Sequence, residues 1–405
     1  MTDTTLVVQK EMNIIFKMNE SDTLFGNSSV FGPFLDEVPT TSLAVQAAKL
    51  LRRICIPIII AIGLCGNTLS LMVFSTQSMK KKSCSVFLGS MAAVDNVFLL
   101  SLLITWFDGE IATIITHDLS CQLLIYFTYV TSFLSVWFIV GFTLERFIAI
   151  RFPLKRQTMC SVRREKIVVV CMSLFAAALY NFSFWAAGMQ KFDNNQGCLL
   201  YSKYFHFLNI VTWVDSVLTM VLPFFIIIIV NSLVLKTILH NPFRVTSASN
   251  RSYRTSNFKC SGQQRHQAMS KPPSPTIVRK TWYSGIQTQL FKSKRPKCRV
   301  ARTLMLVSMT FLGLNLPSHA MRLYNLFSSV VTDHCFISEE YFFIQELTLI
   351  LYYATFSCNF VIYTLCGHNF KKSLLMILKC KSATEESRQR LLERISSQNS
   401  NVTAL

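Results

Sequence analysis

Seven long apolar segments alternate with polar ones along the 405-residue chain. A membrane-spanning helix needs about 20 predominantly apolar residues, and each segment is long enough. Two of them, 54–77 and 167–190, contain no charged residue at all. The pattern therefore predicts an all-α membrane protein, a seven-transmembrane helix bundle with spans at about 54–77, 83–107, 121–145, 167–190, 204–235, 303–328 and 341–366.

Polar stretches divide the chain into three predicted parts. Residues 1–53 are polar and mixed and are expected to form an N-terminal tail. Residues 54–380 form the transmembrane domain, and within it residues 240–300 are basic, Ser-rich and without apolar periodicity. Such a composition is typical of a disordered loop. Residues 381–405 are similar and are expected to form a second polar tail.

A short amphipathic eighth helix is predicted after the seventh span. On a helix over residues 369–379, one face carries Phe370, Leu374, Leu375 and Leu378, with lysines at its edges. A helix of this kind lies in the membrane–water interface and contacts membrane lipids. Cys380 follows directly and is a candidate for palmitoylation. The alternative is a solvated basic tail with a buried cysteine.

Composition and charge support the membrane assignment. Of the chain, 51% is hydrophobic and only 15% charged, whereas a soluble surface needs more charge. The net charge of +19 is compatible with nucleic-acid binding, but most Lys and Arg residues lie in alternate loops. By the positive-inside rule those loops are cytoplasmic and the N-terminus is extracellular, although Lys49, Arg52 and Arg53 oppose this at the first span. We expect a multi-pass plasma-membrane protein that does not bind nucleic acid.

An acid–base pair, Glu145-Arg146, stands at the end of the third span. An uncompensated charge near hydrocarbon costs several kcal/mol, whereas a paired one is tolerated. One interpretation is a flanking arginine that reaches to the interface. The other is a switch, in which Arg146 is held by its neighbour in one state and released towards a partner in another.

Other short motifs follow one another through the predicted helices. They are Gly66-Asn67 in the first, Asp95 in the second, Pro223 in the fifth, Phe311–Pro317 (FLGLNLP) in the sixth and Asn359–Tyr363 (NFVIY) in the seventh. Together with Glu145-Arg146 they resemble, in order and spacing, the motifs of rhodopsin-like (class A) G-protein-coupled receptors. The stretch FLGLNLPSHAMRLYN is most similar to invertebrate neuropeptide receptors of the FMRFamide and myosuppressin kind.

The resemblance implies roles for individual residues. It implies a disulfide between Cys121 and Cys198, which leaves Cys335 to pair with Cys55 or to stay free. It implies a heterotrimeric G protein as partner, and arrestin as a further one. The residues of coupling and switching would be Glu145, Arg146, Phe311, Pro317, Asn359 and Tyr363. The chain departs from the family pattern at Asn231, Asn315 and Phe360, where Tyr, Trp and Pro are usual, so the activation relay is expected to differ in detail.

Asp95 is a carboxylate in the middle of a span and needs a partner there. Ser135 and Asn359 occupy positions that, by the resemblance, line a shared cavity with it. One hypothesis is an allosteric sodium ion held by Asp95, Ser135 and Asn359. The other is a protonated aspartate in a hydrogen-bonded network. No other cofactor is expected.

The absence of two kinds of residue narrows the class of ligand. The seventh span has no Lys for a retinal Schiff base, and the outer half of the third span has no acid for a small amine; Thr128 occupies that level. The predicted outer face is rich in acidic and aromatic residues, which favours a basic or amidated peptide, although acidic loops also arise simply where basic residues are depleted. We expect Asp215 or Glu346 to take a ligand arginine. His319 and Tyr324 are expected to contact an aromatic end, with Thr128 and Trp213 nearby.

Further expectations concern modification and the competing classes. Asn19 and Asn27 lie in glycosylation sequons of the predicted outer tail. The alternatives to a peptide receptor are a receptor for a non-peptide small molecule and a membrane transporter. A transporter is less favoured because only one acid lies deep in a span and no repeat is visible. The chain has no GxSxG or HExxH motif, and we expect no enzyme activity.

Overall fold

The fold was analysed on a computed structural model. The structure describes residues 43–152, 156–192, 195–240, 305–325, 327, 339–367, 370–377 and 379. The predicted glycosylation sites Asn19 and Asn27, the palmitoylation site Cys380 and the unassigned Cys335 lie outside these residues, as do most of the loop at 240–300 and the two tails.

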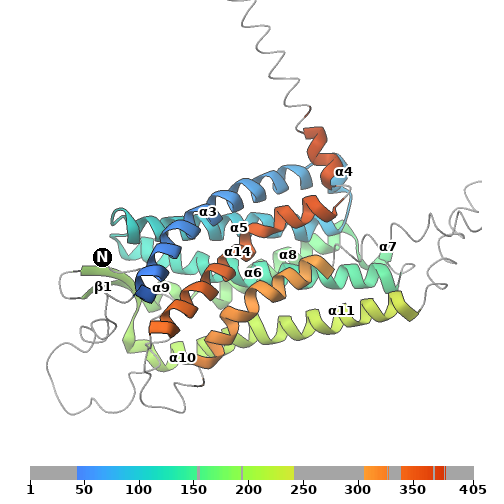
Figure 1. Ribbon diagram of the computed structural model, residues 1–405. Coiled ribbons are helices and arrows are strands. Elements are labelled where there is room, and N and C mark those ends of the chain that lie inside the picture. The colour runs from blue at the N-terminus through green and yellow to red at the C-terminus, as the bar shows by residue number, and fades with distance from the viewer. Residues whose placement is uncertain are drawn as a thin grey trace, which may run out of the picture.

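Long helices dominate the described residues and run side by side along the length of the molecule (Figure 1). Six helical segments are long and apolar enough to cross a membrane: Leu43–Phe74, Cys84–Glu110, Asp118–Arg151, Val162–Ala186, His206–Thr237 and Glu340–Leu365. The helix of residues 305–325 packs among them, between α11 and α14 in Figure 1. The predicted all-α bundle of seven helices is therefore confirmed.

The chain order of the elements is simple. The helices are α3 (Leu43–Phe74), α4 (Gln77–Lys80), α5 (Cys84–Glu110), α6 (Asp118–Arg151), α7 (Arg156–Met159), α8 (Val162–Leu179) and α9 (Ser183–Ala186). The strands β1 (Ala187–Phe192) and β2 (Asn195–Leu200) follow, then η2 (Ser202–Tyr204), α10 (Phe205–Ser216), the π-helical turn η3 (Val217–Val221) and α11 (Leu222–His240). The helix of residues 305–325, α14 (Glu339–Cys366) and the helical residues 370–377 complete the chain.

Two helix ends differ from the predicted spans. Helix α3 begins at Leu43, well before residue 54, because strong helix formers fill this stretch and no breaker precedes Pro57. Arg52 consequently lies inside the helix and is 3% exposed. Helix α8 ends at Leu179 rather than near 190, and Ala187 already belongs to a strand. Residues 167–190 carry no charge across this boundary, so hydropathy alone does not distinguish the end of the helix from the start of the strand that follows it.

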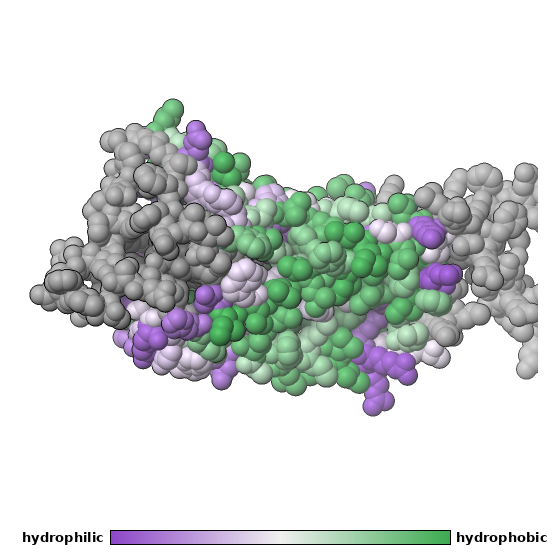
Figure 2. All heavy atoms as spheres, turned by 90° about the horizontal axis from the view of Figure 1, so that it is seen from below, coloured by the Kyte–Doolittle hydropathy of each residue, from purple (hydrophilic) through white to green (hydrophobic). Residues whose placement is uncertain are grey.

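The surface is apolar around the middle of the bundle and polar towards its two ends. Figure 2 shows a hydrophobic band across the described surface, with hydrophilic residues on either side of it. Large apolar side chains such as Leu174, Ile210 and Phe225 are more than half exposed. Buried polar residues such as Asn67 and Asp95 lie inside instead. This distribution is that of a protein whose solvent, around its middle, is lipid.

Helices α3 and α14 approach each other closely at a glycine. A Cβ added at Gly66 would lie 2.8 Å from Cβ of Phe360. Nearby, the amide of Asn67 donates to the backbone carbonyl of Phe356 at 2.9 Å. The Gly66-Asn67 pair therefore fixes the first helix directly against the seventh.

Residues 370–377 are helical and lie next to α4 in Figure 1. Phe370 and Leu374 are buried, and the Phe370 ring packs against Phe74, Phe360 and Tyr363. The interfacial membrane role of this segment stays a prediction.

Candidate functional site

One end of the bundle is closed by the β1–β2 hairpin, and we call it the hairpin end. A disulfide joins Cys121 of α6 to Cys198 of β2, with 5.4 Å between their Cα atoms. The backbone N–H of Met189 donates to Asp118 at 2.7 Å, and the side-chain amide of Gln122 donates to the carbonyl of Ala187 at 3.2 Å. These three links fix the hairpin to the first turns of α6.

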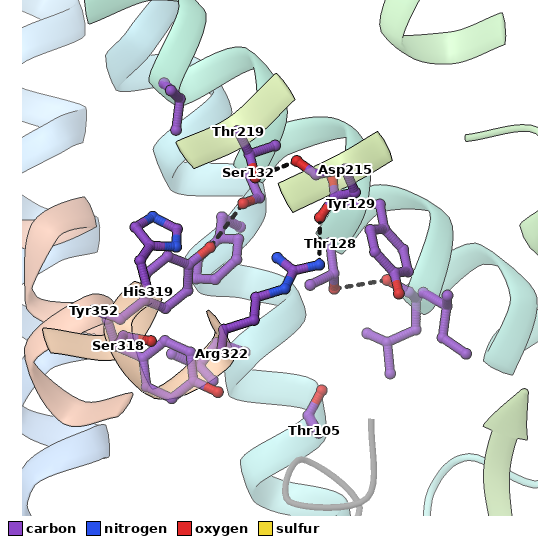
Figure 3. Close-up of a pocket in the computed structure, with 16 residues that line it drawn as sticks. Thr105, Thr128, Tyr129, Ser132, Asp215, Thr219, Ser318, His319, Arg322 and Tyr352 are labelled. Carbon is purple, nitrogen blue, oxygen red and sulfur yellow. Dashed lines mark hydrogen bonds and ion pairs between the residues drawn. The ribbon is translucent and has the colours of Figure 1, made fainter. Parts of the chain in front are cut away.

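A cavity of about 1060 Å³, including the space at its mouth, lies between the helices towards the hairpin end. Helices α5, α6, α10 and α14, the turn η3 and the helix of residues 305–325 all contribute to its wall. The wall combines apolar and aromatic side chains with a few polar ones, as in ligand sites generally. Figure 3 shows its polar members, which are Thr105, Thr128, Tyr129, Ser132, Asp215, Thr219, Ser318, His319, Arg322 and Tyr352.

An ion pair crosses this cavity. Nη2 of Arg322 lies 2.6 Å from Oδ2 of Asp215, and the side chains are 14% and 7% exposed. The hydroxyl of Tyr180 donates to the other carboxylate oxygen at 2.5 Å. Figure 3 shows the guanidinium of Arg322 reaching from its helix into the cavity towards Asp215. Both oxygens of Asp215 are thus engaged, and the two opposite charges compensate each other in a buried place.

His319 lies one helical turn before Arg322 and faces the same cavity (Figure 3). Its ring stands edge-on to Phe224 and Tyr352, with centroid distances of 5.5 Å and 6.4 Å. The side chain is 7% exposed, and its Nε2 atom has no hydrogen-bond partner among the described residues. Beside it, the hydroxyls of Ser132 and Tyr352 are 2.7 Å apart and join α6 to α14.

The structure brings together only some of the predicted ligand-binding residues. Thr128, Asp215 and His319 line the cavity. Trp213, Tyr324 and Glu346 are not among the cavity-lining residues that the structure describes. Trp213 packs against Phe327, Tyr324 is 59% exposed near Tyr341, and Glu346 is buried elsewhere in α14.

Sequence reasoning did not find Arg322 as a site residue. A signal was present, because an arginine inside the apolar segment 303–328 needs a partner. Its partner Asp215 is 107 residues away in sequence, and only the packing of two helices shows that they meet.

Below the cavity, Asp95 is the centre of a polar cluster and is fully buried. Oδ1 accepts a hydrogen bond from Ser135 at 2.6 Å, and Oδ2 accepts one from Asn359 at 2.9 Å. The three residues that the sequence analysis grouped therefore touch one another, from α5, α6 and α14. The geometry suits both hypotheses made for them.

Asn315 takes part in a further contact between helices. Its amide nitrogen donates to the carbonyl of Phe311 at 2.7 Å and to the hydroxyl of Thr355 at 3.1 Å. Asn315 is 2% exposed. At a position where the family usually has a Trp, this chain thus joins the helix of residues 305–325 to α14 by a hydrogen bond.

The opposite end of the bundle, which we call the Arg146 end, carries the acid–base pair. Nη2 of Arg146 lies 2.7 Å from Oε2 of Glu145, and the side chains are 10% and 3% exposed. The hydroxyl of Ser83 donates to Oε1 of Glu145 at 2.7 Å. The guanidinium also stands over the ring of Phe142, 5.4 Å from its centroid. Arg146 is therefore held by its own helix.

A group with metal-ligand chemistry lies close to this pair. The ligand atoms of Glu145, Cys160 and Glu165 are within 4.8 Å of one another. Both oxygens of Glu145 already bind Ser83 and Arg146, and the adjacent guanidinium repels a cation. We therefore assign no metal to this group.

The π-helical turn η3 is supported from α6. A π-turn leaves a backbone carbonyl out of the regular ladder. The indole N–H of Trp137 donates to the carbonyl of Leu218 in this turn at 3.1 Å. The turn begins two residues after Asp215, so Trp137 helps to fix the wall that carries the carboxylate.

Comparison with known proteins agrees with this architecture. The pattern of the family described as 7 transmembrane receptor (rhodopsin family) matches residues 66–363. The chain therefore belongs to the rhodopsin family of seven-transmembrane receptors. Its membership confirms that the protein is a multi-pass membrane receptor and not an enzyme.

Individual relatives are more distant. The chain is 31% identical over 144 residues to the FMRFamide peptide receptor frpr-18 of Caenorhabditis elegans, covering 33% of the chain and 32% of that protein. It is 21% identical over 347 residues to the FMRFamide receptor of Drosophila melanogaster, covering 80% and 53%. It is 28% identical over 186 residues to cysteinyl leukotriene receptor 2 of Mus musculus, covering 44% and 58%. Each match spans less than two thirds of the relative's own length.

Proposed function

We propose that the chain is a G-protein-coupled receptor for an extracellular neuropeptide. The observation that carries the proposal is the cavity at the hairpin end, combined with a buried arginine at the other end of the same helix α6. A receptor needs a ligand site and a coupling site that share moving elements. The hairpin end faces outwards, in keeping with the loop charges, and receives the peptide; the Arg146 end faces the cytoplasm and a heterotrimeric G protein.

The mechanism is a ligand-driven shift between two arrangements of the helices. A ligand shifts such an equilibrium only by its difference in affinity for the two states. The cavity wall includes the helix of residues 305–325, so a ligand that contacts this helix favours one of its positions. Movement of the same helix at the Arg146 end opens a place for the G protein. Arg146 then exchanges Glu145 for the G protein, and arrestin competes for the same opening.

A peptide is favoured by the names of two relatives. Both are FMRFamide receptors, from a nematode and from an insect. The ligand site of this proposal is the cavity at the hairpin end. A peptide end enters it, and the rest of the peptide lies over the hairpin.

A second candidate is a receptor for an acidic, non-peptide small molecule. The observation in its favour is Arg322, a cation that projects into the cavity, and one of the relatives is a cysteinyl leukotriene receptor. The transporter alternative is disfavoured, because the chain belongs to a receptor family.

A sodium ion at Asp95 is part of the proposal. The carboxylate of Asp95 and the hydroxyl of Ser135 are oxygen groups of the kind that a hard cation prefers, and the amide of Asn359, which donates through its nitrogen to Oδ2 of Asp95, would turn its oxygen to the ion. Asp95, Ser135 and Asn359 would hold it. When bound, it would supply positive charge to the buried carboxylate and favour the arrangement in which α5, α6 and α14 converge.

The proposal is tested with membranes from cells that express the chain. A library of amidated and free-acid peptides is screened for guanine-nucleotide exchange on heterotrimeric G proteins, with leukotriene-type lipid acids as a second set. We expect a peptide to accelerate exchange. The variant Arg146→Gln is expected to abolish exchange and to retain peptide binding. Exchange driven by lipid acids alone would favour the second candidate, and solute flux in sealed vesicles without exchange would refute both.

A further inference from the structure

We infer that Glu165 is a positioning residue of the coupling switch, and that it acts together with Glu145 to retain Arg146 in the arrangement that the structure shows. The inference rests on the proposed function, in which Arg146 leaves Glu145 for a G protein, and goes further by naming a second acid that opposes this step. Glu165 lies in the first turn of α8, whereas Glu145 and Arg146 belong to α6. The restraint therefore joins two helices.

Glu165 is buried, although its neighbours in the sequence are exposed. Its exposed fraction is 5%, whereas Arg163, Arg164 and Lys166 lie at the surface. An acid in the first turn stabilises a helix through the helix dipole, but an exposed acid does this as well. Burial of a carboxylate costs free energy unless an opposite charge compensates it. The inward position of Glu165 therefore requires a cation nearby.

Arg146 is a cation that the structure places there. Carboxylate oxygens of Glu145 and Glu165 lie within 4.8 Å of each other, and Nη2 of Arg146 is 2.7 Å from Oε2 of Glu145. Glu165 is thus within electrostatic range of the guanidinium as well. One positive charge stands beside two buried negative charges and attracts both.

The departure of Arg146 would leave the two carboxylates facing each other. Two like charges within 4.8 Å repel strongly where little water screens them. Glu145 would keep the hydroxyl of Ser83, which donates at 2.7 Å, but this group carries no charge. Glu165 consequently raises the free energy of the arrangement in which Arg146 is released. Its charge should therefore keep ligand-independent nucleotide exchange low.

A role in packing alone would not depend on charge. Helix α8 packs against α5 and α6, and a side chain of this size fills space at their junction whether or not it is ionised. The two roles differ in two measurable respects. Only the positioning role predicts that an uncharged side chain of the same shape raises basal exchange, and only this role predicts that the effect depends on Arg146.

Basal exchange tests the charge of Glu165. Membranes from cells that express the full chain are mixed with a panel of purified heterotrimeric G proteins, without peptide, and guanine-nucleotide exchange is measured. Glu165→Gln should raise basal exchange about threefold or more, because it removes the repulsion that opposes release. Glu165→Asp retains the charge and should restore most of the low basal level. Glu110→Gln, the same chemical change at the other end of the bundle, is the matched control and should exchange like wild type.

A double-mutant cycle tests the link to Arg146 without a G protein. Thermal unfolding of the purified receptor is followed for Glu165→Gln, for Arg146→Gln and for both changes together. While Arg146 is present, Glu165→Gln removes an attraction to the guanidinium as well as the repulsion from Glu145. After Arg146→Gln, only the repulsion is left to remove. The unfolding midpoint should therefore respond to Glu165→Gln more favourably in the second background, by about 2 °C or more.

The outcomes separate this inference from the proposed function. Unchanged basal exchange in Glu165→Gln, an equal rise in Glu165→Asp, or the same midpoint shift in both backgrounds would leave Glu165 with a packing role and overturn the inference. Absence of exchange in every variant, with peptide or without, would refute the receptor proposal, and the cycle would still decide whether Glu165 restrains Arg146. If Glu165→Gln does not fold, Glu165→Met, which is uncharged and similar in length, replaces it in both experiments.

Discussion

Breaking the Asp215–Arg322 pair should destabilise the protein strongly, and Asp215→Asn tests this. Asparagine has the shape of aspartate, but it replaces one accepting oxygen by an N–H₂ group and removes the negative charge. In the structure the two oxygens of Asp215 face two donors, from Arg322 and Tyr180. The variant therefore leaves one accepting oxygen in place of two and leaves the guanidinium of Arg322 buried without a counter-charge.

The expected loss is large. Breaking a buried ion pair by removing one partner costs about 3–5 kcal/mol. Because the side chains of Arg322 and Asp215 are 14% and 7% exposed, solvent compensates little of this. At roughly 2–4 °C per kcal/mol, the midpoint of thermal unfolding should fall by several degrees or more.

A double-mutant cycle gives the sharpest measurement. Tryptophan fluorescence follows thermal unfolding of the purified receptor with Asp215→Asn, Arg322→Met and both changes together. The double variant should be more stable than the two losses combined predict, because it leaves no unpaired charge. Glu110→Gln is the matched control, since its partner Arg53 is 69% exposed at 3.8 Å and such pairs contribute about 0–1 kcal/mol. If the two losses of stability were strictly additive, or if the loss were no larger than that of the control, Asp215 and Arg322 would not form a buried ion pair.

Three other predictions concern the packing and the polar core. Trp137→Phe should destabilise the receptor by about 0.5–1.5 kcal/mol, because the carbonyl of Leu218 loses its donor; an unchanged unfolding midpoint would contradict this. Gly66→Ala should cost about 1–3 kcal/mol by the same assay, because the added methyl group meets Phe360, and a neutral result would show that α3 and α14 are not in close contact. Asp95→Asn should abolish the dependence of peptide affinity on sodium concentration, measured against potassium at equal ionic strength; retained dependence would place the ion elsewhere.

The helices could be predicted from the sequence because a membrane imposes a simple rule. A span must be apolar over its length and must satisfy its own backbone, so the runs from Ile167 and from Tyr341 identify helices without further information. The prediction was less accurate at the ends of the spans, where hydropathy does not distinguish a helix from a following strand. Ala187 follows an apolar helix and is itself apolar, yet it starts a strand, because its backbone pairs with Leu200 on the opposite strand of the hairpin.

The residues of the polar core could be predicted from the sequence, whereas the partners of Asp215 in the cavity could not. Asp95, Ser135 and Asn359 could be grouped, because the family pattern specifies which positions face one another. Arg322 and Tyr180 have no such pattern to place them beside Asp215. Their meeting depends on the rotation of two helices about their axes, which is set by many weak contacts over the whole interface. The contacts of Arg322 and Tyr180 with Asp215 could therefore be found only from the structure.

The contacts of the helix of residues 305–325 differ in strength along its length, and this has a mechanical consequence. Near the hairpin end the helix is held by the Arg322–Asp215 ion pair. Towards the Arg146 end its described hydrogen bonds to other helices are those from Asn315 to Thr355 at 3.1 Å and between Ser308 and Thr143 at 3.5 Å, beside the packing of Val307 and Phe311 in the core. Breaking a neutral hydrogen bond of this kind costs about 1 kcal/mol, less than the cost of separating the two buried charges. A displacement driven from the cavity should therefore pivot near Arg322 and be largest at the Arg146 end, where a partner would bind.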